Sequence, residues 1–71
     1  MRIRVKQIEA TINGQSVNLL RHGSIVVDVA VPEGEALDDE LVYDAVMHYL
    51  DALGIDVYLF DVTSIDYETI N

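Results

Sequence analysis

The chain has 71 residues, a length that suits one domain over residues 1–71 and leaves little room to enclose a deep active-site cleft. It contains no cysteine, which excludes disulfides, thiolate metal ligands and cysteine nucleophiles. Four Lys/Arg against 13 Asp/Glu give a formal net charge of −9, so we expect the protein to repel nucleic acid and anionic membranes.

Residues 2–12 have the alternating apolar pattern of a strand. The alternation changes phase midway. Its apolar residues are at odd positions in the first half, Ile3 and Val5, and at even positions in the second half, Ile8, Ala10 and Ile12. A β-bulge near Lys6-Gln7 would bring both sets to one side of the strand. The alternative is a twist that ends the strand at that point.

The dipeptide Asn13-Gly14 predicts a two-residue type I′ turn, and therefore a β-hairpin. Such a turn sets the register on one face: Ile12 opposite Gln15, Ala10 opposite Val17, Ile8 opposite Leu19. It pairs polar residues on the other face: Thr11 with Ser16, Glu9 with Asn18. Because burial of one face specifies the register strongly, we expect the hairpin to form in this way.

A turn at residues 22–24 is expected to lead into a third strand over residues 25–31. One face of this strand is entirely apolar and carries Ile25, Val27, Val29 and Val31. The tripeptide Pro32-Glu33-Gly34 is expected to end it, because proline and glycine interrupt regular pairing.

Residues 38–53 have the apolar periodicity of a helix. Asp38 is the expected N-cap, and a slightly earlier start capped by Glu35 is the alternative. Gly54 occupies the position where a glycine commonly ends a helix in a left-handed conformation.

Residues 55–63 are predicted to form a fourth strand, and apolar residues on both of its faces favour a central position in the sheet. Residues 64–70 either continue this strand or form a fifth one at the sheet edge. The element order is therefore strand, strand, strand, helix, strand. This order favours an α+β fold of two layers, with one helix packed on a mostly antiparallel sheet of four or five strands.

The sequence contains no recognisable catalytic, metal-binding or cofactor-binding motif. His48 lies between Asp44 and Asp51 on one side of the helix, which would suit an imidazole activated by a neighbouring carboxylate, or a weak metal site. An exposed helix face in which carboxylates stabilise an imidazolium explains the same grouping, and no nucleophile accompanies it. We therefore expect no enzymatic activity, no metal site and no cofactor.

The charges are distributed unevenly along the chain. All four bases lie in residues 1–24, whereas residues 25–71 hold twelve acids and neither Lys nor Arg. We expect the bases to pair with acids of the same chain or to protect an edge strand.

The predicted helix carries two distinctive stripes beside its sheet-facing residues. The first is narrow and polar: Glu40, Asp44, His48 and Asp51. The second is apolar: Tyr43, Met47 and Leu50. Packing on a sheet needs a stripe only somewhat wider than 100°, so the second one suits either a partner or dimer surface or the edge of the core.

The loop and helix together form an acidic unit that holds Glu33, Glu35, Asp38, Asp39, Glu40, Asp44 and Asp51. In size, acidity and general layout the chain resembles small phage-encoded DNA-mimic proteins, which include some anti-CRISPR proteins. The resemblance implies a non-enzymatic inhibitor that docks on a nuclease or its guide complex and presents carboxylates where phosphates would sit. The acids expected to contact this basic protein partner are Glu40, Asp44, Asp51, Asp38 and Asp39.

The alternative hypothesis is a small structural or accessory protein. In that case the apolar stripe mediates formation of a homodimer or docking on a larger assembly, and the acidity serves solubility. The basic N-terminus lacks the apolar run that follows it in a signal peptide, and no apolar run is long enough to span a bilayer. We therefore expect a cytoplasmic protein.

Overall fold

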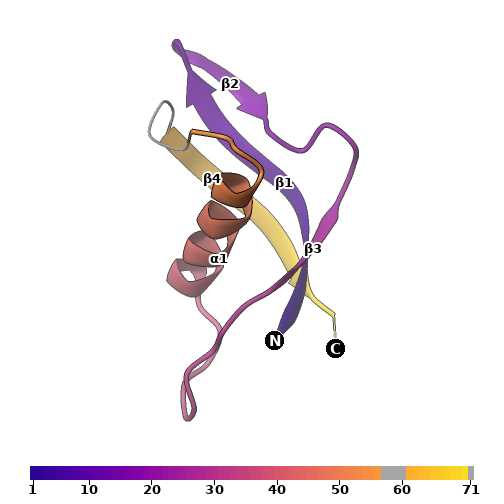
Figure 1. The fold of residues 1–71 in the computed structure, drawn as a ribbon, viewed down its shortest axis with the longest axis vertical. Coiled ribbons are helices and arrows are strands. Elements are labelled where there is room, and N and C mark those ends of the chain that lie inside the picture. The colour runs from indigo at the N-terminus through magenta and orange to yellow at the C-terminus, as the bar shows by residue number, and fades with distance from the viewer. Residues whose placement is uncertain (57–60, 71) are drawn as a thin grey trace.

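The computed structural model describes residues 1–56 and 61–70. Within these residues the chain forms, in order, β1 (Arg2–Ile12), β2 (Gln15–Asn18), β3 (Ile25–Asp28), α1 (Asp39–Ala52) and β4 (Asp61–Thr69). The strands make one antiparallel sheet, and the helix lies across one face of it (Figure 1). The predicted two-layer α+β arrangement is confirmed.

β1 is the central strand of this sheet. It pairs with β4 along one edge and with β2 and then β3 along the other. A central position was expected for a strand over residues 55–63, and the described end of that range, residues 61–63, belongs to β4, which pairs with β1 alone in the described part of the chain.

The expected strand over residues 55–63 falls partly on residues 57–60, which lie outside the described residues. Residues 55 and 56 belong to no strand, and residues 61–63 begin β4. β4 then continues to Thr69, so residues 64–69 extend that strand and do not form a separate one.

Two β-bulges keep β1 and β4 paired over most of their length. The pairing shifts between Val5 and Gln7, which leaves Lys6 as the extra residue of β1. A second shift lies between Glu9 and Ala10 and leaves Thr63 as the extra residue of β4. The Thr63 hydroxyl donates to the carbonyl oxygen of Glu9 over 3.2 Å. The predicted bulge is thus confirmed, and it places four fully buried residues on the same face: Ile3, Val5, Ile8 and Ala10.

The hairpin between β1 and β2 forms in the predicted register, from Ile12 opposite Gln15 to Glu9 opposite Asn18. Asn13 has φ 52° and Gly14 has φ 78°. Positive φ at both central residues is the requirement of a type I′ turn, which explains why this dipeptide is found here.

β2 and β3 follow the same edge of β1, with a loop between them. Residues 6–8 of β1 face six residues of this segment, residues 19–24, so the loop must leave the plane of the pairing. Figure 1 shows it swinging away from β1. β3 ends at Asp28, short of the predicted residue 31, because its partner strand begins at Arg2. Only Met1 remains beyond Arg2, and it bonds to Val29: the Val29 amide donates to the Met1 carbonyl oxygen over 2.8 Å, and the Met1 amino group donates to the Val29 carbonyl oxygen over 2.9 Å.

The helix begins and ends as predicted. The Asp38 side chain accepts a hydrogen bond from the Leu41 amide over 2.9 Å, so the alternative start at Glu35 is wrong. Gly54 has φ 82° and follows the last turn. Three buried residues spaced four apart face the sheet: Val42, Val46 and Leu50. In the described part of the chain, no helix is long and apolar enough to cross a membrane.

Candidate functional site

Three of the four basic side chains lie on the sheet face away from the helix, because they alternate with buried residues of β1. Each is in an ion pair there. Arg4 Nη1 lies 3.0 Å from Glu68 Oε1, and Lys6 Nζ lies 3.5 Å from Glu68 Oε2. Arg2 Nε lies 3.9 Å from Asp28 Oδ1. The predicted pairing of bases with acids of the same chain is confirmed for these three.

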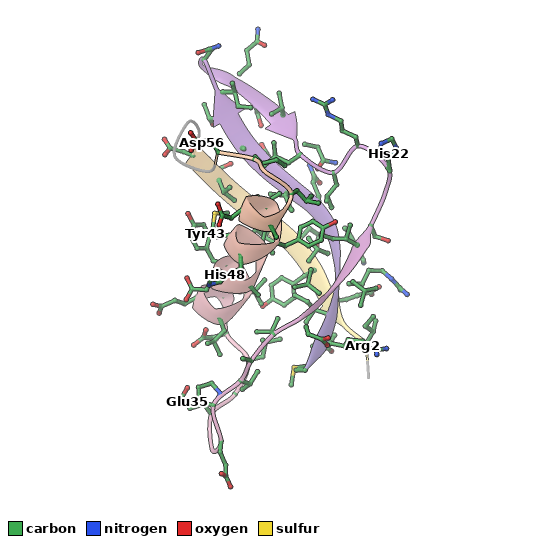
Figure 2. The ribbon with its side chains drawn as sticks, viewed as in Figure 1. Arg2, His22, Glu35, Tyr43, His48 and Asp56 are labelled. Carbon is green, nitrogen blue, oxygen red and sulfur yellow. The ribbon has the colours of Figure 1, made fainter. Side chains whose placement is uncertain are left out.

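The acidic side chains of the helix and its N-terminus are on the other side of the molecule. We call the following five residues the acidic face: Asp38, Asp39, Glu40, Asp44 and Asp51. All five are exposed, and among the described residues none of them is in an ion pair with Lys or Arg. Figure 2 shows Arg2 and His48 on opposite sides of the view, with Glu35 on the loop beyond the start of the helix.

Helical geometry brings Glu40, Asp44 and Asp51 to one side of α1, turned away from the buried line of valines and leucine. His48 is exposed between the two aspartates. No hydrogen bond or ion pair joins His48 to either aspartate, and in residues 1–56 and 61–70 no group of three or more His, Asp or Glu side chains could hold a metal ion. The structure thus places His48 on the exposed side of α1, together with Asp44 and Asp51.

Two residues of the acidic face also have structural contacts. Asp38 caps the helix, and Asp39 Oδ1 accepts a hydrogen bond from the Tyr67 hydroxyl over 2.9 Å. This bond, with a smaller contribution from burial and from the charge of Asp39, raises the pKa of Tyr67 above its usual range. The contact connects β4 to the helix, and no local sequence signal could have indicated it, because the partners are 28 residues apart.

The predicted apolar stripe does not form a continuous surface. Tyr43 is 43% exposed and Met47 is half-buried against the core, but Leu50 is only 1% exposed. The assignment of Leu50 to a partner surface is therefore wrong. Leu50 lies one turn beyond Val46 in the core line, and the chain after Gly54 turns back so that the Ile55 amide bonds to the Leu50 carbonyl oxygen over 3.1 Å.

A groove at the C-terminal end of α1 was not indicated by any sequence pattern. The groove has a volume of about 770 Å³ and is lined by the 19–24 loop, by the last turn of the helix and by Ile55. Its walls are mainly apolar, with Arg21 and His22 at one side. The groove lies where the 19–24 loop is longer than the facing residues 6–8 of β1. This difference in length becomes visible only once the strand pairing is known.

Comparisons of the chain with protein-family models, with curated proteins and with solved structures found no match. Two surface features of the described residues are candidates for function, the acidic face and the groove. The acidic face has unneutralised charge on a rigid helix, and the groove has apolar walls beside a cation.

Proposed function

We propose that this chain is a non-enzymatic binding module of the cytoplasm whose acidic face engages the basic surface of a protein partner. The partner that this chemistry suits best is a nucleic-acid-handling protein or complex, which the module inhibits by occupying its basic groove. The observation that carries the proposal is the separation of charge. Three bases are in ion pairs with Asp28 or Glu68 on the outer sheet face, whereas the acidic face has no Lys or Arg partner among the described residues.

The spacing of the acids supports the choice of partner. Asp51 lies eleven positions after Glu40, which corresponds to about 16 Å along the axis of an α-helix. One strand of a duplex places a phosphate about every 3.4 Å along its axis. The stripe thus covers the length of about five phosphates, and its carboxylates would meet the Lys and Arg side chains that normally hold the nucleic-acid backbone.

The overall charge favours a basic protein over nucleic acid itself. A chain with a net charge of −9 repels a polyanion and attracts a basic protein surface, which accelerates the encounter at low salt. Because exposed charges are screened beyond about 8 Å at physiological ionic strength, the complex should weaken as salt is raised.

The proposal is tested with two charge reversals that change the net charge equally. Asp44→Lys alters the acidic face and suits the helix, because the new lysine would stand four residues after Glu40. Asp66→Lys alters the outer sheet face, where Asp66 lies opposite Gln7 and makes no ion pair with a described residue. Wild type and both variants are immobilised, exposed to lysate of the native host at low salt and washed with rising salt.

We expect wild type and Asp66→Lys to retain the same nucleic-acid-handling protein, Asp44→Lys to lose it, and salt to release it. The purified partner should then bind or cleave its nucleic acid less well as wild-type chain is added, with little effect from Asp44→Lys. Equal losses in both variants would mean that only the total charge matters. A partner that keeps its full nucleic-acid activity in the saturated complex would rule out inhibition by occupation of the groove.

A further inference from the structure

The groove at the end of α1 is a second candidate binding site, and it does not depend on the acidic face. Its volume of about 770 Å³ lies in the range of small-molecule sites. Its apolar lining comes from three segments and includes Leu19, Leu20, Ile25, Tyr49, Leu53 and Ile55. Leu53 is 59% exposed, so its apolar side chain is accessible to a ligand in the groove.

Hydrogen bonds from backbone amides hold both walls of the groove in place. On the loop side, Asn18 Oδ1 accepts from the Ile8 amide over 3.2 Å and from the Leu20 amide over 3.0 Å. The Leu19 amide donates to the Ile8 carbonyl oxygen over 2.8 Å. On the helix side, the bond from Ile55 to Leu50 fixes the chain that follows α1. The groove is therefore formed before any ligand arrives, which lowers the entropic cost of binding.

Arg21 gives the groove a specific charge. It lines the groove, it is exposed, and it makes no ion pair with any residue in the described part of the chain. The other three bases are all paired. The adjacent His22 also lines the groove and lies on the outer bend of the loop (Figure 2). An unpaired guanidinium beside an apolar groove matches a carboxylate attached to an apolar body, since Arg binds carboxylates with two parallel hydrogen bonds.

We propose that the groove binds a small amphipathic monocarboxylate, with its carboxylate on Arg21 and its apolar tail between the 19–24 loop and the end of α1. Charge selects this occupant over larger ones. A second copy of the chain brings another net charge of −9, and nucleic acid or an anionic membrane brings still more, so long-range repulsion opposes each of them. A single negative charge is matched by the one local cation.

The test uses the full chain labelled with ¹⁵N and the soluble probe octanoate, with 1-octanol as a probe of the same tail length without charge. Octanoate should cause saturable shifts in the amides of residues 19–24 and 53–55, and it should bind about tenfold more tightly than 1-octanol. Arg21→Gln should abolish this preference, and Arg21→Lys should keep part of it. Leu53→Ser should weaken both probes alike, because it removes only apolar contact.

Each variant is first checked for a native amide spectrum, which we expect because both side chains are exposed. The proposal is overturned if octanoate gives no saturable shifts, if the shifts lie elsewhere, or if Arg21→Gln retains the preference for octanoate. Sedimentation provides the remaining test. A wild-type dimer that Leu53→Ser converts to a monomer would make the groove an interface between copies and would also overturn the proposal.

Discussion

The Tyr67 hydroxyl donates a hydrogen bond to Asp39 Oδ1 over 2.9 Å, and this contact connects the last strand to the first turn of the only helix in the described residues. Asp39 therefore contributes both to the acidic face and to the docking of α1 on β4. In a 71-residue domain, whose stability is on the order of 3–5 kcal/mol, one such bond between distant segments matters.

We expect Tyr67→Phe to lower the free energy of unfolding by about 1 kcal/mol, because the ring is kept and only the hydrogen bond is lost. Urea unfolding at neutral pH measures this loss. Tyr43→Phe is the matched control, since the Tyr43 hydroxyl has no hydrogen bond to any described residue. Equal effects of the two substitutions would contradict the importance of the bond.

The same pair predicts a dependence on alkaline pH. The pKa of Tyr67 is raised, first by the bond to Asp39 and then by burial, so the folded chain holds the phenol proton more tightly than the unfolded chain. The stabilisation is fully present below the unfolded pKa of about 10 and is lost as pH rises through the raised folded value. The stability difference between wild type and Tyr67→Phe should therefore shrink from pH 8 to pH 11.

The ion pairs of the outer sheet face predict the opposite pH dependence. The hydrogen bond from Arg4 and the charge of Lys6 lower the pKa of Glu68 below its usual 4.5. A lowered folded pKa stabilises the fold above the unfolded pKa, and this contribution disappears as pH falls through the lowered value. Wild type should exceed Glu68→Gln in stability at pH 7, and the difference should vanish in strong acid.

Denaturant unfolding between pH 7 and pH 2 checks this prediction, and added salt should reduce the difference because all three side chains are solvent-accessible. Asp66→Asn is the control, as Asp66 lies on the same sheet face without an ion pair to a described residue. A gap between wild type and Glu68→Gln that stayed constant over the whole pH range would contradict the assignment.

Much of the fold could be predicted because its signals are local. The Asn13-Gly14 turn, the parity change at Lys6, the Asp38 cap and the Gly54 terminator each need only a few neighbouring residues, and all four are confirmed. The position of the C-terminal strand could not be predicted in this way, because strand order depends on pairings between distant segments.

The candidate site was predicted less well than the fold. The acids of the helix could be placed on one side from periodicity alone, and they are exposed as expected. Leu50 was assigned to the surface although it follows Val42 and Val46 at intervals of four residues, and this spacing places it in the buried line of the helix. The groove beside Arg21 was missed for a different reason, since it lies where two segments of unequal length face each other, and this mismatch is visible only once the pairing is known.

The burial of Leu50 leads to a prediction that separates the core from the surface. Leu50→Ala should cost about 2–5 kcal/mol, which is comparable to the whole stability of such a domain, so the variant should be largely unfolded by circular dichroism. Leu53→Ala is the control on the same helix end, and its effect should be small because Leu53 is 59% exposed. Leu50→Met should remain folded, because it nearly conserves volume. A mild effect of Leu50→Ala would contradict the assignment of Leu50 to the core.

The cap at Asp38 allows its structural contribution to be separated from its charge. Asp38 Oδ1 accepts from the Leu41 amide over 2.9 Å, so Asp38→Ala should destabilise the fold by about 1 kcal/mol and lower the melting temperature by about 4–8 °C. Asp38→Asn should be nearly as stable as wild type, because asparagine caps as well as aspartate and loses only the interaction of charge with the helix dipole. Thermal unfolding of the three proteins compares these effects directly. If Asp38→Asn destabilised the fold as much as Asp38→Ala, the contribution of Asp38 would be electrostatic, and the hydrogen bond to Leu41 would matter little.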